Sequence, residues 1–112
     1  MHPTQGLDDL VHQRVRLGIL SVLHSIGRAD FTTLAEVLDL TSGNLSRNLR
    51  VLEEHGYVAI EKAFERRRPR TWVSVTADGT AALRHEVEAL RDLLDLVAEP
   101  LTGSGGPGPP RL

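Results

Sequence analysis

The chain contains no cysteine and few aromatic side chains, with one tryptophan, one tyrosine and two phenylalanines among 112 residues. Without cysteine there can be no disulfide, no thiol-based redox sensor and no thiolate ligand for a metal. No apolar run approaches the roughly 20 residues that a membrane-spanning helix needs, and the first residues are polar, unlike a signal peptide. These absences predict a cytoplasmic bacterial protein with no membrane association.

Motifs that carry catalysis are also missing. The sequence has no nucleophile motif and no glycine-rich phosphate loop. Residues 103–112 hold four glycines and three prolines without a periodic apolar pattern, a composition typical of disordered chain. We therefore expect a non-enzymatic protein without a cofactor, with one folded domain at residues 1–99 and a disordered tail at 100–112.

The formal net charge of -2 argues against nucleic acid, but the charges are unevenly distributed. Residues 47–70 hold seven basic against four acidic side chains, whereas residues 76–99 hold six acidic against two basic. A basic face on an acidic body suits a protein that docks one side on DNA. An ordinary mixed surface is the alternative, and the position of the basic run beside the segment described next favours DNA.

Residues 41–56 have the pattern of a capped amphipathic helix that stops at a glycine. Leu45, Leu49 and Leu52 fall on one face, and small polar residues with two arginines fall on the other. Arginine can donate two hydrogen bonds to a guanine edge, and Asn, Ser and Thr can reach base edges or phosphates. The candidates for direct base contact are Asn44, Ser46, Arg47 and Arg50, flanked by Ser42, Gly43 and Asn48. Thr41 or Ser42 is expected to cap the helix.

A second basic element follows, between alternating runs at residues 57–63 and 71–76. Two such runs around a short loop predict a β-hairpin, and its tip at residues 63–70 carries Arg66, Arg67, Arg68 and Arg70, stiffened by Pro69. Arginines at such a tip can reach DNA phosphates or the minor groove. Arg70 has an alternative role as a brace of the hairpin.

The remaining segments have the patterns of helices. A first helix is expected at residues 7–25, ending near Gly27, and a second is expected to be capped by Thr32 or Thr33 and to end in a turn at residues 39–40. Thr76 is expected to cap a last helix that stops at about Glu99, before Pro100. A generic three-helix bundle is the alternative, but it leaves the arginine-rich hairpin unexplained.

Taken together, these elements resemble the winged helix-turn-helix transcriptional regulators of the MarR/ArsR-like group, in their short single-domain form. The resemblance covers residues 8–98 and rests on Leu34-Ala35-Glu36-Val37-Leu38, on residues 41–57, on Arg68-Pro69-Arg70-Thr71-Trp72 and on Thr76-Ala77-Asp78-Gly79. It implies a mainly α fold with a small β-hairpin. It also implies a sequence-specific regulator that places helix 41–56 in the major groove of double-stranded DNA and the 63–70 wing on phosphates or in the minor groove.

The last helix carries a coiled-coil seam. Apolar residues recur at alternating spacings of four and three, at Leu83, Val87, Leu90, Leu94 and Val97. We expect this helix to hold a homodimer that binds a near-palindromic operator, most simply as a repressor covering a promoter, although activation stays open. The alternative is a monomer in which one broad stripe faces the core.

Two other functions have weaker support in the sequence. His85 and Glu88 lie one turn apart on the last helix and could supply metal ligands across a dimer, but such residues on a solvated helix are usually surface groups, so no metal is predicted. A small-molecule effector could occupy a cleft between the first and last helices. The rival function is a winged-helix module for protein–protein interaction, which would be expected to lack a basic wing or to carry an apolar patch on helix 41–56.

Overall fold

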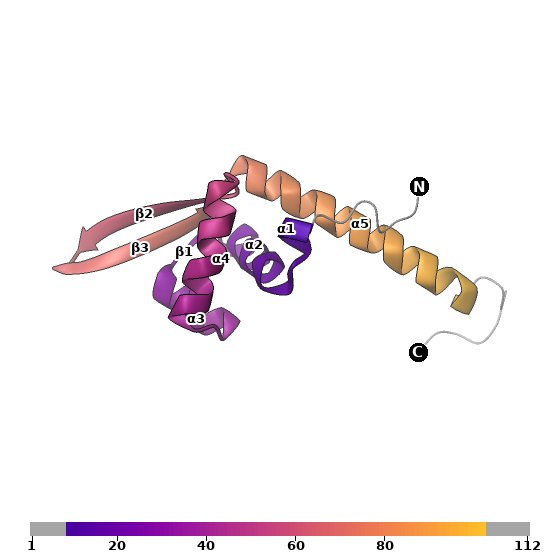
Figure 1. The fold of residues 1–112 in the computed structure, drawn as a ribbon, viewed down its shortest axis with the longest axis horizontal. Coiled ribbons are helices and arrows are strands. Elements are labelled where there is room, and N and C mark those ends of the chain that lie inside the picture. Colours follow the sequence, from indigo (N-terminus) through magenta and orange to yellow (C-terminus); the bar gives the residue numbers. More distant parts are fainter. Residues whose placement is uncertain (1–8, 103–112) are drawn as a thin grey trace.

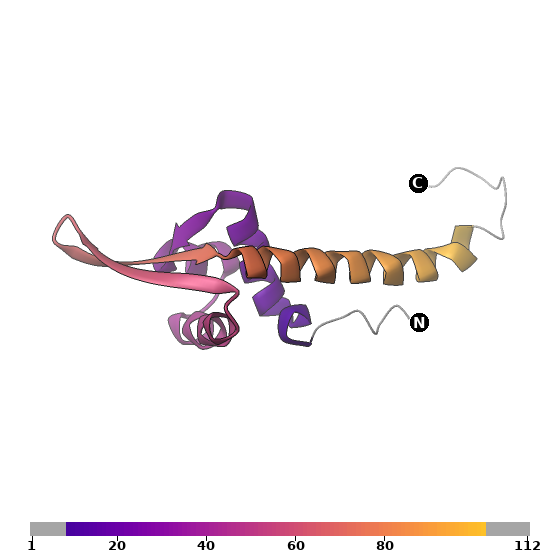
Figure 2. The ribbon, with the colours of Figure 1, turned by 90° about the horizontal axis from the view of Figure 1, so that it is seen from above.

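The computed structural model describes residues 9–102 of the chain. It contains α1 (Asp9–His12), α2 (Arg14–Ile26), β1 (Arg28–Asp30), α3 (Phe31–Leu38), α4 (Ser42–Glu54), β2 (Val58–Glu65), β3 (Arg68–Val75) and α5 (Ala77–Thr102). The strands form an antiparallel sheet in the order β1-β3-β2. The hairpin of β2 and β3 points away from the helices on one side, and α5 projects on the other (Figures 1 and 2). This is the expected winged helix-turn-helix, mainly helical with a small sheet and a long last helix.

The core lies where α2, α3, α4 and the base of the sheet meet. The apolar face predicted for the recognition helix is confirmed, since Leu45, Leu49 and Leu52 are all buried. The other buried apolar residues of this cluster are Val11, Ile19, Leu20, Leu23, Ala29, Leu34, Val58, Val73 and Leu83. Burying these side chains leaves the opposite face of α4 directed at solvent.

The first helix is broken, contrary to the prediction of one helix over residues 7–25. The backbone leaves the helical region at Gln13, with φ -56° and ψ 130°, and the Gln13 side chain caps α2 by accepting from the amide of Arg16 at 3.0 Å. The Arg16 side chain then donates to the carbonyl of Leu10 at 2.5 Å, so a side chain satisfies an acceptor next to the break. The predicted end is confirmed, because Gly27 caps α2 at φ 89°.

The cap of α3 also differs from the prediction. Asp30, and neither Thr32 nor Thr33, is the N-cap residue, and its carboxylate accepts from the amide of Thr33 at 2.8 Å. Asp30 also ends β1, a three-residue strand that the sequence pattern did not predict. The strand is too short to show an alternation, and it exists because its backbone pairs with β3.

The recognition helix α4 begins and ends as predicted. Thr41 caps it by accepting from the amide of Asn44 at 3.1 Å. At its other end Gly56 adopts φ 76°, the amide of Gly56 donates to Glu53, and the amide of Tyr57 donates to Leu52. This double C-terminal bond satisfies two free carbonyls and turns the chain sharply into β2.

The hairpin is longer and its turn tighter than expected. The strands reach Glu65 and Arg68, so Arg66 and Arg67 alone form the turn, with φ 52° and 65°. Positive φ at both central positions is the type I′ geometry, which matches the twist of a two-residue hairpin. Pro69 lies within β3 opposite Phe64, beyond the stretch of β3 that pairs with β1. A proline there removes no hydrogen bond from β1–β3 pairing.

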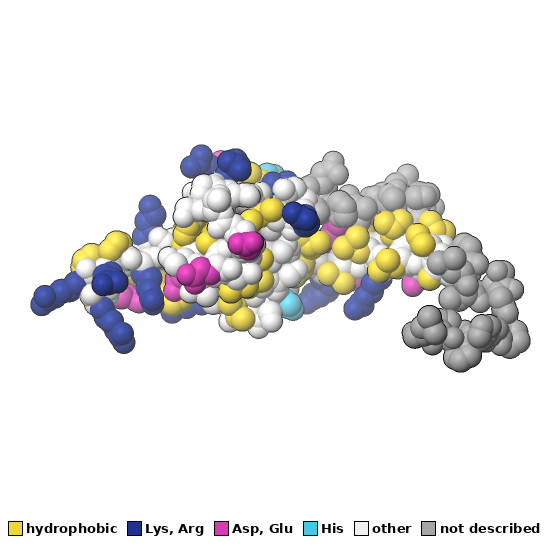
Figure 3. All heavy atoms as spheres, turned by 90° about the horizontal axis from the view of Figure 1, so that it is seen from below, with side chains coloured by type: hydrophobic (Ala, Val, Ile, Leu, Met, Phe, Trp, Pro, Cys, Tyr) yellow, Lys and Arg dark blue, Asp and Glu magenta, His cyan; other side chains and the backbone are white. Residues whose placement is uncertain are grey.

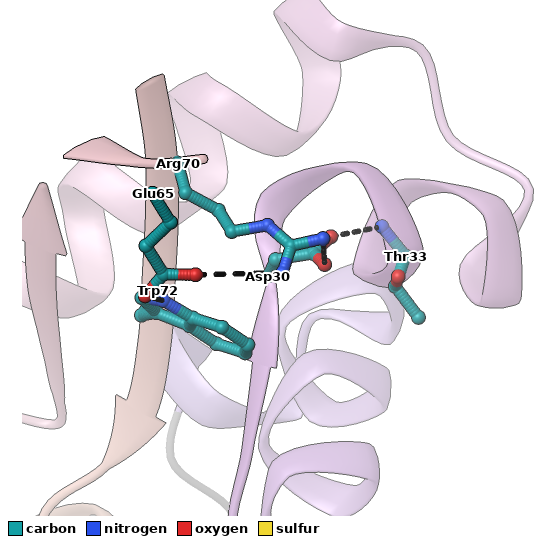
Figure 4. Close-up of polar contacts among 5 residues, drawn as sticks. All are labelled: Asp30, Thr33, Glu65, Arg70 and Trp72. Carbon is teal, nitrogen blue, oxygen red and sulfur yellow. Dashed lines mark hydrogen bonds and ion pairs between the residues drawn. The ribbon is translucent and has the colours of Figure 1, made fainter. Parts of the chain in front are cut away.

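The outer half of the hairpin is tied to the start of α3 through one arginine. The Arg70 guanidinium lies 3.6 Å from the Asp30 carboxylate and 3.7 Å from the Glu65 carboxylate, and the Trp72 indole N–H donates to Glu65 at 3.1 Å (Figure 4). The hydrogen bond from the amide of Thr33, with a smaller contribution from Arg70, lowers the pKa of the Asp30 carboxyl below its usual value. These contacts fix the wing relative to the helix-turn-helix.

The long helix α5 starts in close contact with the corner between α4 and β2. Thr76 caps α5 as predicted, since its hydroxyl accepts from the amide of Gly79 at 2.9 Å, while the same hydroxyl donates to the carbonyl of Gly56 at 2.6 Å. Gly79 packs so tightly on Tyr57 that a Cβ there would overlap the Tyr57 carbonyl oxygen.

The helix passes Pro100 and ends at Thr102, so the predicted stop at Glu99 is wrong. Pro100 therefore lies in the last turn of α5, where its missing N–H removes one amide donor. Residues 103–112 of the predicted tail lie outside the described residues.

Replacing Gly79 tests this packing. We expect Gly79→Ala to lower the free energy of unfolding by about 1–3 kcal/mol, because the new methyl group must displace backbone. Gly43→Ala is the matched control, since a Cβ at that helical position meets nothing within 4 Å and alanine favours the helix by up to about 1 kcal/mol. Urea denaturation of both variants measures the two effects. A Gly79→Ala protein as stable as the parent would contradict the close approach.

The Asp30 contacts predict a pH-dependent stability. Asp30→Asn keeps a side chain that can cap α3 but loses the charge beside Arg70, so it should cost less than about 1 kcal/mol at pH 7. Because folding lowers the pKa of Asp30, its charge stabilises the fold above about pH 4, the unfolded value, and this contribution disappears as the pH falls through the folded value.

Denaturation of the parent and of Asp30→Asn at pH 7 and at pH 3 should therefore show a difference that shrinks with acid. Asp30→Ala, which loses the cap as well, should be about 1 kcal/mol less stable than Asp30→Asn at both pH values. A difference between the parent and Asp30→Asn that grew toward low pH would contradict the assigned direction of the pKa shift.

Candidate nucleic-acid interface

The outer face of α4 carries most of the residues predicted to contact DNA. Ser46, Arg47 and Arg50 are exposed along one side of the helix, and Ser42 and Gly43 are exposed at its start. None of these side chains is needed for the apolar core, which uses the opposite face. The structure therefore brings small polar groups and two guanidinium groups together on one open helix surface, as the sequence pattern indicates.

Two of the predicted contact residues are placed differently. Asn48 is only 6% exposed, and its amide is engaged within the protein, so its assignment to a DNA contact is corrected. Its side-chain oxygen accepts from Arg16 at 3.1 Å, and its nitrogen donates to the carbonyl and the side-chain oxygen of Asn44. Asn44 is half-buried, and its side-chain oxygen accepts from Asn48. Helical periodicity places Asn48 near the boundary of the two faces, where Arg16 supplies a donor to its side-chain oxygen.

The wing arginines fall into two groups. Arg66 and Arg67 at the turn and Arg68 next to it are exposed, and their charges project from the far end of the molecule (Figure 3). Arg70 is also exposed, but its guanidinium is paired with Asp30 and Glu65 and lies 5.3 Å from the centre of the Trp72 ring. The bracing role considered for Arg70 is thus present in the structure, and the tip arginines are the ones with open surroundings.

The two basic elements border a common groove. A groove of about 550 Å³ runs between α4 and the hairpin, with Ser46 and Arg50 on one wall and Lys62 and Thr71 on the other. Phe31, Leu49, Glu53 and Ile60 complete its lining. Each wall therefore carries one basic side chain, Arg50 on α4 and Lys62 on the hairpin, and the α4 wall also carries Glu53.

Three groups near this surface were not predicted from the sequence. Lys62 follows Val58 and Ile60 on the same side of β2 and shows no motif, so only the fold places it in the groove that Arg50 also lines. Arg28 lies with its guanidinium 4.0 Å from the centre of the Trp72 ring, a cation–π contact between β1 and β3. Phe64 is 72% exposed in β2, opposite Pro69 near the wing tip. An apolar residue in an alternating strand gives no signal that its side faces solvent.

The predicted seam of α5 divides between two environments. Leu83 is buried in the core of its own chain, so its assignment to a dimer interface is corrected, and Val87 packs against the same core. Leu90 is half-buried, whereas Leu94 and Val97 are 65% and 57% exposed. The helix leaves the body of the molecule partway along its length, and its projecting part presents apolar side chains to solvent (Figures 2 and 3).

His85 and Glu88 are both exposed on α5. Across residues 9–102, no three His, Asp or Glu side chains are grouped closely enough to hold a metal ion. Within the same range, none of the helices combines the length and the apolar character needed to cross a membrane.

Comparisons with known proteins agree with this geometry. A family model for the winged helix DNA-binding domain matches residues 15–94. A transcriptional regulator homologue from Pyrococcus horikoshii OT3 is 36% identical, with a TM-score of 0.77 over 80% of this chain and 89% of that one. An uncharacterized protein of Methanocaldococcus jannaschii is 34% identical over 79 residues, which cover 70% of this chain and 86% of the relative.

The crystal structure of MarR is 25% identical, with a TM-score of 0.74 over 90% of this chain and 73% of that one. The matched residues 15–94 run from α2 into α5 and include α4 and the whole wing. The chain therefore belongs to the winged helix DNA-binding domain family and has the fold of the MarR-type transcriptional regulators.

Proposed function

We propose that this regulator acts as a homodimer that binds a near-palindromic operator, with α4 in the major groove and the wing on phosphates or in the minor groove. The observation that carries the proposal is the common groove between α4 and the hairpin, in which Arg50 lies on one wall and Lys62 on the other. An α-helix fits the major groove, and a hairpin at its side then lies over the neighbouring backbone.

The two basic elements have different tasks in this proposal. On α4, Arg47 and Arg50 donate to base edges, with guanine the best match for a bidentate guanidinium, while Ser42, Gly43 and Ser46 allow close approach. At the wing, Arg66, Arg67 and Arg68 neutralise phosphates and release counterions, which strengthens binding to any sequence. Sequence preference therefore comes chiefly from α4.

The homodimer is proposed from the projecting part of α5. Exposed apolar side chains on a helix that leaves the body of the molecule lose solvent contact when two copies pack together, and Leu94 and Val97 are the most exposed of them. A two-fold arrangement of copies presents two α4 helices to successive major grooves, so the half-sites should lie about one helical turn apart. Covering a promoter in this way would repress transcription.

Selection of bound sequences from a random duplex library is the experiment that tests the proposal. Enrichment of an inverted repeat with half-sites about one helical turn apart would support it. Weak, salt-sensitive binding without any enriched sequence would contradict sequence-specific regulation and favour the rival function, a module for protein–protein interaction.

Arginine substitutions separate base contacts from phosphate contacts. Arg47→Ala should weaken binding to the selected operator by about 1–3 kcal/mol and relax the preference at one base pair of each half-site. Arg67→Ala should weaken binding to selected and random duplexes alike and reduce the slope of log K against log salt by about 1. Fluorescence anisotropy over a salt series measures both effects.

Arg84→Ala is the matched control, because Arg84 is an exposed arginine on α5 outside the proposed interface. Equal losses for Arg47→Ala and Arg67→Ala on both kinds of DNA would refute this division of labour.

Charges placed on α5 test the homodimer. The double variant Leu94→Glu/Val97→Glu should sediment as a monomer at micromolar concentration, because a dimer would bury two carboxylates per chain at its interface. As a monomer it should bind a half-site more weakly than the parent binds the full repeat. Val37→Glu is the control, since Val37 is 60% exposed on α3 and lies outside the proposed interface. A parent protein that is itself monomeric by light scattering at this concentration would rule out the dimer.

A further inference from the structure

A line of hydrogen bonds connects α2 to the start of the recognition helix. The guanidinium of Arg16 donates to the side-chain oxygen of Asn48 at 3.1 Å. The side-chain nitrogen of Asn48 then donates to the side-chain oxygen of Asn44 at 2.7 Å and to the Asn44 carbonyl at 2.9 Å. Asn48 is buried, whereas Asn44 lies at the edge of the exposed face of α4.

The direction of this line is set by chemistry. A guanidinium has five N–H donors and no acceptor, and it stays protonated in proteins. Asn48 must therefore present its oxygen to Arg16, which leaves its nitrogen facing Asn44. Because that nitrogen is a donor, Asn44 must in turn present its oxygen inward. Reversing either amide would bring donors face to face at a buried site and leave polar groups unsatisfied there.

We propose that Arg16 and Asn48 are positioning residues that hold the Asn44 carboxamide with its oxygen inward and its NH₂ group toward DNA, so that Asn44 acts as a hydrogen-bond donor there. The partner is an acceptor atom, either on a base edge or on a phosphate. This inference rests on the proposed DNA-binding function and extends it to the chemistry that one residue of α4 can recognise.

The orientation narrows what Asn44 can contact. An asparagine that recognises adenine with two hydrogen bonds needs its oxygen and its nitrogen together, to accept from N6 and donate to N7. With the oxygen turned inward to Asn48, the group that Asn44 presents to DNA is its NH₂, which can only donate. Its possible partners are O6 or N7 of guanine, N7 of adenine, O4 of thymine or a phosphate oxygen.

The variant Asn48→Asp reverses the orientation with almost no change of shape. The aspartate still accepts from Arg16, but its second oxygen faces Asn44, which must then turn its NH₂ group inward and its oxygen outward. We expect the affinity for the selected operator to fall about tenfold or more. The NH₂ donor that Asn44 presented to an acceptor on DNA is replaced by its oxygen, which cannot bond to that acceptor. The free energy of unfolding should fall, because the carboxylate loses the hydrogen bond to the Asn44 carbonyl, although Arg16 keeps an anionic partner.

The DNA measurement distinguishes the two kinds of partner. A loss confined to the operator, with a new base preferred at one position, identifies a base contact. An equal loss on random duplexes identifies a phosphate contact when Arg16→Met, which adds no carboxylate, shows it beyond the loss of Arg14→Met, because a new negative charge alone weakens binding to any DNA. Unchanged affinity and unchanged preference on both would overturn the inference.

A second readout does not depend on DNA. In the ¹⁵N spectrum of the free parent protein, the side-chain NH₂ of Asn48 should exchange slowly with solvent and that of Asn44 quickly. In Asn48→Asp the NH₂ of Asn44 should become slow. A slowly exchanging NH₂ at Asn44 in the parent would overturn the proposed orientation. If Asn48 exchanges slowly and Asn44 quickly but the protein binds no DNA, the proposed function is refuted while the proposed orientation is supported.

Arg16→Met removes the donor that sets the direction, so both amides should become free to turn. We expect the operator affinity to fall toward that of Asn48→Asp and the difference in exchange between Asn44 and Asn48 to narrow. Arg14→Met is the matched control, because Arg14 is an exposed arginine on the same helix. A loss of affinity as large in Arg14→Met as in Arg16→Met would count against a specific role for Arg16.

Discussion

The contact between Gly79 and the backbone of Tyr57 is the constraint on which the placement of α5 relative to the recognition helix α4 depends. At this point α4 ends, β2 begins and α5 starts, and the Thr76 hydroxyl joins the carbonyl of Gly56 to the first turn of α5. Because backbone packs on backbone here, no flexible side chain can absorb a change of angle. The direction of α5 relative to α4 is therefore fixed by the main chain, and so would be the separation of two recognition helices in a dimer.

The predictable parts of the molecule are those that local chemistry decides. Thr41 is a good cap followed by an amphipathic pattern, and Gly56 is a glycine at the expected end, so α4 could be located from the sequence. The alternating strands and the arginine cluster likewise located the wing. The fold class followed from the order of these elements.

Several of the differences from prediction involve partners distant in sequence. The strand β1 exists because β3 lies beside it, and buried Asn48 is bonded to Arg16, 32 residues earlier. The break at Gln13 and the cap of α3 are local instead, since their hydrogen bonds join residues three to six positions apart. Leu83 satisfies a heptad pattern, but the start of α5 packs on its own domain, so periodicity alone could not separate an internal contact from an interface between copies.

The hairpin turn also has a meaning for how this protein could change under selection. A two-residue turn with positive φ at both positions favours Asn-Gly, and a side chain with a Cβ pays roughly 1–2 kcal/mol at each such position, yet here both residues are arginines. Substitutions that relax the backbone at this tip would remove charge from the part of the molecule farthest from the core. Variants selected for heat resistance without a need to bind DNA should therefore change first at these two positions. Each such substitution would raise thermostability and lower the affinity for DNA.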